Sequence, residues 1–363
     1  MQIKDVHITL LSVPWVEPPA FLAGFDWQRE FLVLEVETSD GITGMGFLQP
    51  ITGGVRTVAA CLREQIIPRV LGRDATHIEA LWKELYVANH MIGRMGVVLF
   101  AISALDMALW DALGKRAGLP LYRLWGAFRD EVPVYGSGCY RGLGGDGMVA
   151  KAQRYVAQGF KAIKMQVAHL HTLQQDVAHV RQMRDALGPD IEIMIDVNQG
   201  WTADEAIRAG RHFEELDIAW LEEPVPVDDV KGYRRVSRAL RLPIAGGENH
   251  YTRWDMQPLV EAQAVSILQP DVMRGGLTEL RKIAAMAEPW GIRIAPHLFP
   301  ELMVHLLCSI PNGLMLEYMG WMDDLLVDPP LPRDGMLRPP EAPGHGLAFQ
   351  PTVLADHQMS ETA

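Results

Sequence analysis

The feature that most constrains this chain is a unit of one short apolar strand and one helix, repeated from about residue 132 onward. Eight strands are expected, at 132–135, 161–165, 191–196, 218–222, 243–247, 265–269, 292–296 and 313–317. Segments of helical composition, such as 147–158 and 203–215, separate most of them. Eight strands in this rhythm favour a closed barrel over an open sheet. We therefore predict an α/β barrel, of the (β/α)7β or (β/α)8 kind, over residues 126–325.

The residues on either side of the barrel predict two further parts. Residues 1–125 have the pattern of an N-terminal α+β capping domain, with strands at 3–12, 29–38 and 45–48 and helices from about 54 to 117. Apolar residues at spacings of three and four between Val97 and Leu109 predict a helix with one buried face. Residues 326–363 are rich in Pro and Gly, and we expect them to extend back over the capping domain.

Charge and cysteine content exclude several classes of function. The formal net charge is −12 and no run of Lys or Arg is present, which disfavours nucleic-acid binding. Three widely spaced cysteines argue against a disulfide framework or a zinc cluster. The N-terminal segment is interrupted by Lys4 and Asp5, so it does not resemble a signal peptide, and the uncharged stretch 302–316 is too short and polar to span a bilayer. We expect a cytoplasmic protein with no membrane or nucleic-acid partner.

Acidic residues follow three successive predicted strands. Asp196, Glu222 and Glu248 stand 26 residues apart, about one strand and one helix each. In a barrel these positions direct three carboxylates into one opening at the C-terminal ends of the strands. Unpaired carboxylates that converge repel one another, and a hard divalent cation relieves that repulsion. Mg²⁺ prefers oxygen ligands of this kind, so the sequence predicts a magnesium site.

A second pair of residues has the same spacing. Asp271 follows the sixth predicted strand and His297 follows the seventh, again 26 residues later. Adjacent barrel strands would let the carboxylate accept a hydrogen bond from the imidazole, which raises the basicity of His297 and fixes its tautomer. Lys164 ends the second strand and Glu317 the eighth.

The ordered motifs resemble those of the enolase superfamily, and most closely the mandelate racemase subgroup. They are KMQ at 164–166, DVN at 196–198, EEP at 222–224, GEN at 247–249, PDVMRGG at 270–276, HLFPE at 297–301 and LEY at 316–318. The resemblance covers nearly the whole chain, as a capping domain, a barrel and a returning tail.

The resemblance implies a role for each motif residue. Asp196, Glu222 and Glu248 would hold one Mg²⁺ per subunit, and Asp271 and His297 would form the catalytic dyad. Glu317 would donate a hydrogen bond to the carboxylate of a small carboxylic acid substrate. It also implies a homo-oligomer, either a dimer or an octamer.

Two further positions are interpreted through the same resemblance. Asn198 would support the site or contact the substrate; the galactonate dehydratase branch has a His there, which makes that branch less suitable. Arg274 stands where related proteins often have Lys, and we interpret it as a cation behind the dyad or as a surface ion pair.

Gln166 departs from the pattern of the subgroup, which has Lys-x-Lys on the second strand with the second lysine as a base facing the dyad. An amide can form hydrogen bonds but cannot exchange a proton near neutral pH. His297 is then the obvious acid and base, and a single imidazole suits removal of an α-proton followed by loss of a β-hydroxyl. We favour dehydration of a 2,3-dihydroxy sugar acid to a 2-keto-3-deoxy acid. The enediolate would be stabilised by Mg²⁺, Lys164 and a proton on Glu317.

Three alternatives remain open. A racemase or epimerase would need Lys164 or Tyr140 as the second base. A cycloisomerase would be expected to have lysines on both sides of the barrel. A barrel that binds an acid without turning it over would have no physical need for both the metal set and the dyad.

Two segments of the capping domain are expected to form a lid over the substrate. The first, 14–28, offers Phe25 and Trp27 as contacts, and the second lies around 49–56, where glycines permit movement. Arg56 and Arg94 are the candidate cations for a second carboxylate. A diacid would need one of these cations beside its second carboxylate. Because the first lid segment is apolar and offers no cation, the sequence favours a monoacid.

Overall fold

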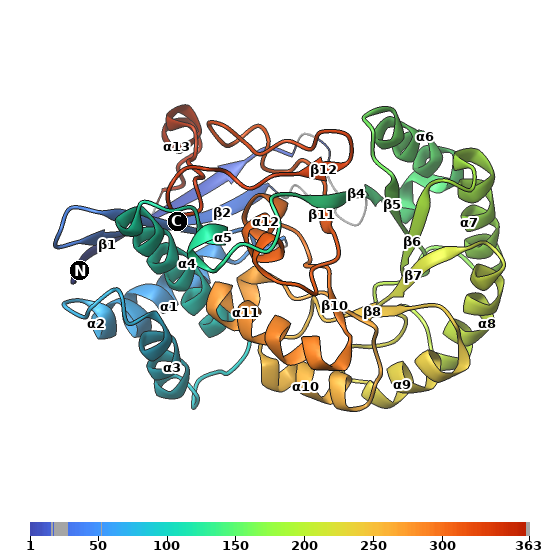
Figure 1. Cartoon of the computed structure of the whole chain (residues 1–363), viewed down its shortest axis with the longest axis horizontal. Helices are drawn as coiled ribbons and strands as arrows, with labels where there is room; N and C mark the ends of the chain where they lie inside the picture. Colours follow the sequence, from blue (N-terminus) through green and yellow to red (C-terminus); the bar gives the residue numbers. More distant parts are fainter. Residues whose placement is uncertain (16, 18–27, 52, 361–363) are drawn as a thin grey trace.

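The computed structural model describes residues 1–15, 17, 28–51 and 53–360. The C-terminal part is a barrel with helices on its outer side (Figure 1). Its strands are β4 (Val132–Cys139), β5 (Ala162–Gln166), β6 (Glu192–Asp196), β7 (Ile218–Glu222), β8 (Ile244–Gly246), β9 (Ile267–Leu268), β10 (Arg293–Ile294) and β11 (Leu316–Tyr318). All eight predicted strands are present, although β9 and β10 are only two residues long.

The strands are parallel and run in the order β10-β9-β8-β7-β6-β5-β4-β11. The ring closes next to β11. The N–H of Leu314 donates to the carbonyl of Ile294 at 2.8 Å, and the N–H of Ile294 donates to Asn312 at 2.9 Å. Closure places the C-terminal ends of all eight strands around one opening.

One helix follows each of the first seven strands. They are α6 (Gly144–Ala157), α7 (Leu173–Leu187), α8 (Ala203–Glu214), α9 (Val230–Ala239), α10 (Arg253–Glu261), α11 (Gly276–Ala287) and α12 (Pro300–Ser309). The next described helix after β11 is α13 (Pro351–Asp356), which lies in the tail. The architecture is therefore (β/α)7β, the first of the two predicted forms.

The capping domain is an antiparallel sheet packed on helices. The sheet contains β1 (Ile3–Val13), β2 (Arg29–Thr38) and β3 (Thr43–Leu48), and the helices are α1 (Val55–Cys61), η2 (Leu62–Ile66), α2 (Ile67–Val70), α3 (Ile78–Ala88), α4 (Val97–Ala117) and α5 (Leu121–Leu124). The α4 helix is buried on nearly every side, whereas one buried face was predicted. It is long and apolar enough to cross a membrane, but 83% of its most apolar window is buried inside this fold.

Two glycines let β3 lie directly on α4. A Cβ atom on Gly46 would stand 2.0 Å from the carbonyl oxygen of Ala104, and one on Gly44 would stand 2.0 Å from that of Ala108. Neither contact is sterically possible, so the close approach of sheet and helix depends on the missing side chains.

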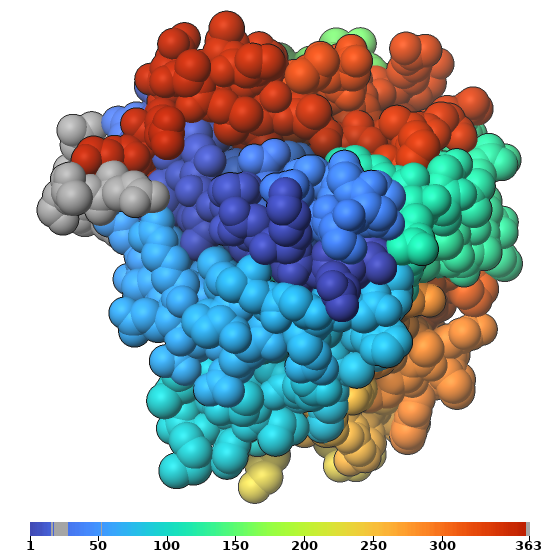
Figure 2. Space-filling model, turned by 90° about the vertical axis from the view of Figure 1, so that its left-hand side faces the viewer, coloured from blue at the N-terminus to red at the C-terminus, as the bar shows by residue number. Residues whose placement is uncertain are grey.

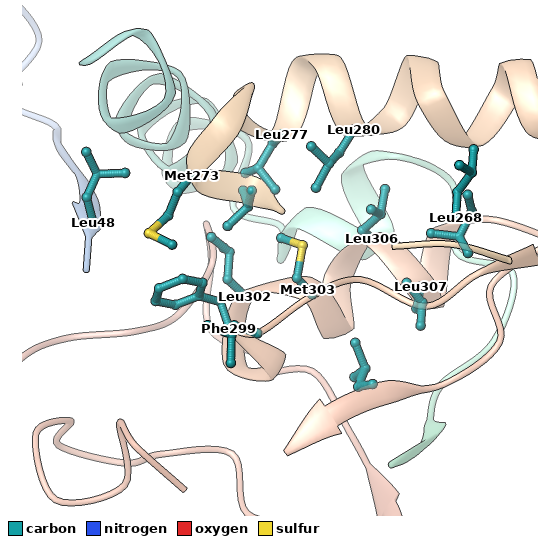
Figure 3. Close-up of a cluster of buried hydrophobic side chains, with 14 of the residues drawn as sticks. Leu48, Leu268, Met273, Leu277, Leu280, Phe299, Leu302, Met303, Leu306 and Leu307 are labelled. Carbon is teal, nitrogen blue, oxygen red and sulfur yellow. The ribbon is translucent and has the colours of Figure 1, made fainter. Parts of the chain in front are cut away.

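The capping domain holds the segment that follows β9. Leu48 at the end of β3 faces Met273 and Phe299 (Figure 3). The indole N–H of Trp82 donates to the carbonyl of Gly275 at 2.8 Å, and the hydroxyl of Ser103 donates to that of Val272. The cap therefore fixes the backbone on both sides of Arg274.

The tail returns along the capping domain, as the space-filling view shows at the C-terminal end of the colour scale (Figure 2). The N–H of Met359 donates to Leu10 at 2.8 Å, and the N–H of Ser12 donates to His357 at 2.9 Å. The ring of Phe349 contacts Phe31 and Phe47 edge-on. These contacts agree with the expected course of residues 326–360, while the domain boundaries themselves stay a prediction.

Candidate active site

A cavity of about 420 Å³ opens at the C-terminal ends of the barrel strands. Most of the residues singled out from the sequence line it together: Tyr140, Lys164, Gln166, Asp196, Asn198, Glu248, Asp271, Arg274, His297 and Glu317. Glu222 is fully buried behind the wall. Phe25 and Trp27 lie outside the described residues.

The three acids predicted as metal ligands lie at the ends of neighbouring strands. Asp196 on β6 is paired in register with Glu222 on β7, and Glu248 follows β8. Burial, with repulsion from Glu248, raises the pKa of Asp196 to about 6. Burial also raises the pKa of Glu248, although His297 opposes that rise. The negative charges of these carboxylates repel one another. A bound cation would relieve that repulsion, so the pocket favours a cation.

Lys164 provides positive charge from within this acidic group. Its ammonium lies 2.7 Å from Glu222 and 2.8 Å from Glu317 and is almost wholly buried. Burial lowers the pKa of Lys164, but the two carboxylates outweigh burial and raise it well above its usual value. Lys164 is therefore a buried cation in this arrangement.

The three acids form an all-oxygen set of donors for a divalent cation. Among the described residues, no three His, Cys, Asp or Glu side chains already form a coordination sphere. Glu222 accepts from Lys164 and from the indole of Trp220 at 3.0 Å, and Asp196 accepts from the N–H of Asn198 at 2.8 Å. Each carboxylate oxygen nevertheless retains a further lone pair. An all-oxygen set of buried, mutually repelling acids fits Mg²⁺, and the assignment of the three ligands stays a prediction.

The structure brings the two residues of the predicted dyad together. Nδ1 of His297 lies 2.9 Å from Oδ2 of Asp271. Because an ionised carboxylate only accepts, Nδ1 donates to Asp271, and Nε2 is the ring nitrogen left for other partners. Nε2 lies 3.7 Å from Oε2 of Glu248. Burial lowers the pKa of His297, but Glu248 and Asp271 outweigh it and raise this pKa to about 10.

Glu317 is surrounded by donors. It accepts from the hydroxyl of Ser137 at 2.7 Å, from the N–H of Leu298 at 3.1 Å and from Lys164. Burial raises its pKa, but Lys164 and His297 outweigh burial and lower the pKa to about 2. Glu317 is therefore an ionised acceptor here, and its predicted role as a hydrogen-bond donor would require a proton that this arrangement does not favour.

The amide of Asn198 is oriented by a residue that the sequence analysis missed. A guanidinium N–H of Arg141 donates to Oδ1 of Asn198. Because Arg can only donate, the carbonyl oxygen of Asn198 faces Arg141 and its NH₂ group faces elsewhere. Arg141 stands in a short 3₁₀ turn after β4, and its only sequence signal was a cation one residue past Tyr140. That signal has no meaning until the fold brings residues 141 and 198 together.

Residues other than glycine adopt left-handed backbone angles at three strand ends. Asn198 has φ 45°, Glu223 has φ 41° and Leu298 has φ 54°. Each lies one or two residues beyond Asp196, Glu222 or His297. Conformations of this kind are disfavoured in ordinary chains and persist where the surrounding structure fixes them, often at functional sites.

The cations expected near the lid take other positions. Arg56 donates to the carbonyl of Ser360 in the tail at 2.8 Å, and neither Arg56 nor Arg94 lines the cavity. Arg274 does line it, so the interpretation as a surface ion pair is wrong. The described wall nearest the cap instead contributes Ile51, Phe100 and Trp321.

The chain matches two consecutive family domains. Residues 5–126 match the N-terminal domain of the mandelate racemase / muconate lactonizing enzyme family, and residues 147–353 match the enolase C-terminal domain-like family. The chain belongs to the mandelate racemase / muconate lactonizing enzyme family of the enolase superfamily. This membership confirms the resemblance, and the chain is an enzyme of this superfamily rather than an inert barrel.

Relatives within the family have different activities. A 3,6-anhydro-alpha-L-galactonate cycloisomerase from Streptomyces coelicolor is 38% identical over 88% of this chain and 89% of its own length. The crystal structure of a racemase from Streptomyces coelicolor with bound magnesium has a TM-score of 0.93 and 35% identity, and it covers 98% of this chain and 100% of its own. The structure of an L-talarate dehydratase from Polaromonas, solved with Mg and L-glucarate, has a TM-score of 0.92 and 33% identity. It covers 99% of this chain and 98% of its own. Family membership alone therefore does not determine the reaction.

Proposed function

We propose that this enzyme dehydrates a sugar acid with hydroxyl groups on carbons 2 and 3 to a 2-keto-3-deoxy acid, with His297 as the base. The observation that carries the proposal is an asymmetry in the cavity. His297 is held by Asp271 at 2.9 Å and has an imidazole that can exchange a proton, while Gln166 offers only an amide, which cannot. Gln166 stands on β5, and His297 follows β10 on another part of the ring.

The acids that would hold Mg²⁺ are Asp196, Glu222 and Glu248, and magnesium is present in the related racemase and L-talarate dehydratase structures. When bound, Mg²⁺ would add positive charge against the substrate carboxylate and offset the effect of Glu248 on His297. Lys164 stands ready as a second cation because Glu222 and Glu317 keep it protonated.

The proton transfers follow from these positions. Nε2 of His297 takes the α-proton, and the electron pair left on carbon 2 moves toward the carboxylate to give an enediolate. Lys164 donates to the oxygen on which this charge develops. The bond between carbon 3 and its hydroxyl then breaks, and the protonated His297 gives its proton to the leaving hydroxyl, which departs as water. The resulting enol tautomerises to the keto acid.

The proposal is tested by incubating the protein with Mg²⁺ and a library of sugar acids in D₂O. We expect a semicarbazide-reactive keto acid from at least one of them. His297→Asn should abolish both product formation and exchange of the α-proton, because Asn cannot exchange a proton. Asp271→Asn is the matched variant, and it should retain a residual rate because the imidazole is still present. Decay of optical rotation with no keto acid would contradict dehydration and support a racemase.

Cycloisomerisation is the second candidate, favoured by the relative of 38% identity with that activity. It begins with the same proton abstraction but expels no water. The mass of the product separates the two reactions, because dehydration removes one water and isomerisation leaves the mass unchanged.

A further inference from the structure

Arg274 differs from the other cations of the cavity in having no carboxylate partner. Lys164 lies between Glu222 and Glu317, and His297 lies between Asp271 and Glu248. Within the described ranges, Arg274 forms no ion pair, although it lines the same cavity. In an otherwise acidic cavity, this guanidinium is a positive charge available to a ligand.

The guanidinium is held in place by neutral groups. One terminal N–H donates to the hydroxyl of Tyr251 at 3.2 Å and another to Oδ1 of Asn249 at 3.1 Å. Its central carbon lies 5.2 Å from the ring centre of Tyr251 and 6.0 Å from that of Phe100. Rigid placement lowers the entropic cost of binding an anion.

The Nε–H of Arg274 is buried and has no acceptor among the described residues. Because this atom has no exposed surface, a ligand in the cavity can reach only the terminal nitrogens, each of which has a second N–H besides the one bonded to Tyr251 or Asn249. The fork of the guanidinium matches the two oxygens of a carboxylate, which could accept two parallel hydrogen bonds.

The position of Arg274 in the barrel sets which end of a substrate it can reach. Arg274 follows β9 and Lys164 lies on β5, and these strands are four apart in a ring of eight, on opposite sides. Under the proposed function the reacting carboxylate lies beside Lys164. A group bound at Arg274 is therefore a different group from the carboxylate beside Lys164.

We infer that Arg274 binds a second carboxylate at the distal end of the substrate, so that the preferred substrates are aldaric acids, with a carboxylate at each end. The inference rests on the proposed function for the location of the reacting end. It replaces the monoacid expected from the sequence, which assumed that Arg56 and Arg94 were the available cations.

The experiment compares two substrates of identical configuration that differ only at the last carbon, an aldarate with a carboxylate and the aldonate with a hydroxymethyl group. The wild-type enzyme should prefer the aldarate by about 10- to 100-fold in kcat/KM, the range expected for hydrogen bonds to a charged group. Arg274→Gln should remove most of this preference, chiefly through KM for the aldarate. Arg274→Lys keeps the charge but not the two-pronged guanidinium. Its preference for the aldarate should lie between those of the wild type and Arg274→Gln.

The ratio of kcat/KM for the aldarate to kcat/KM for the aldonate distinguishes loss of the contact with the second carboxylate from a general loss of stability. Arg274 also contacts Asn249, so a loss of stability would lower both activities and leave their ratio unchanged. Arg56→Gln is the matched control, because Arg56 is an arginine outside the cavity, and it should keep the wild-type preference. Equal or better use of the aldonate by the wild type, or an unchanged ratio in Arg274→Gln, would overturn the inference.

A binding measurement keeps the inference testable if no sugar acid is turned over, which would contradict the proposed function. Unreactive dicarboxylates of five and six carbons are titrated into the Mg²⁺-loaded protein by calorimetry, against the matched ω-hydroxy monoacids. Tighter binding of the dicarboxylates that is lost in Arg274→Gln supports the anchor. Equal binding of both classes contradicts it.

Discussion

At the scale of the residue, Gln166 decides how many faces of the substrate can exchange a proton. The side chain lines the cavity and its amide lies 3.5 Å from Oδ2 of Asp196. Gln166→Lys places an amine where the wild type has none. We expect this variant to introduce α-deuterium from D₂O on the face opposite His297, detected by NMR of the recovered substrate. Gln166→Met, which also removes the amide but adds no base, should leave the stereochemistry of exchange unchanged; the same outcome in Gln166→Lys would count against a one-base reaction.

Glu301 predicts a pH dependence of stability. It is fully buried in α12, its Oε2 atom has no partner among the described residues, and burial raises its pKa from 4.5 to about 8. The folded state then binds a proton more tightly than the unfolded state. The free energy of unfolding should therefore fall as pH rises from about 4.5 to about 8, by at most about 1.4 kcal/mol for each step of one in pH.

Thermal unfolding of Glu301→Gln between pH 5 and pH 8 checks this dependence. The amide cannot ionise, so the variant should gain stability over the wild type as pH rises. A difference between the two proteins that stays constant with pH would show that Glu301 has an ordinary pKa in the folded state.

At the scale of the element, the packing of β3 on α4 depends on glycine. Gly46→Ala would force a methyl group against the carbonyl of Ala104. We expect a loss of about 3 kcal/mol in the free energy of unfolding, at the upper end of the range for overpacking, because backbone atoms obstruct the new group. Denaturant unfolding measures it. Gly93→Ala is the control, since the nearest atom to its added Cβ is 3.4 Å away; equal losses in both variants would exclude the steric explanation.

The barrel strands and the residues at their ends could be predicted because each is encoded locally. A short apolar run followed by an acid, as at Asp196 or Glu222, needs no knowledge of the rest of the chain. The roles of Arg141 and Arg274 could not be predicted in this way. Arg141 acts on Asn198 across two strands, and Arg274 is fixed by Tyr251 and by the capping domain, so their positions exist only in the folded molecule.

The burial of α4 was underestimated for a related reason. Periodicity reports the most apolar face of a helix, but Ser103 and Asp106 on the remaining faces are buried too, through hydrogen bonds to Val272 and Thr278. Polar residues satisfied by a distant partner look like surface residues in a sequence. The burial of Ser103 and Asp106 therefore cannot be predicted without the barrel residues that pack against them.

At the scale of the whole molecule, three aromatic rings connect the tail, the cap and the site. The ring centres of Phe349 and Phe47 are 5.8 Å apart, and so are those of Phe47 and Phe299. Phe299 stands two residues after His297. Phe349→Ala should reduce stability by about 3 kcal/mol, as for other large buried rings. It should also lower kcat, because the loop holding the proposed base His297 loses support. Calorimetry and steady-state kinetics measure the two effects, and a stability loss with unchanged kinetics would show that the tail supports the cap alone.

The return of residues 345–359 onto strands made from residues 3–48 also sets an order of events during synthesis. Leu11 and Phe31 are translated before the barrel, yet the segment that covers them is translated after it. A nascent chain whose barrel is already complete still exposes this apolar surface. Premature termination between the last barrel strand and residue 345 would thus release a chain with a nearly whole barrel and an uncovered, aggregation-prone face.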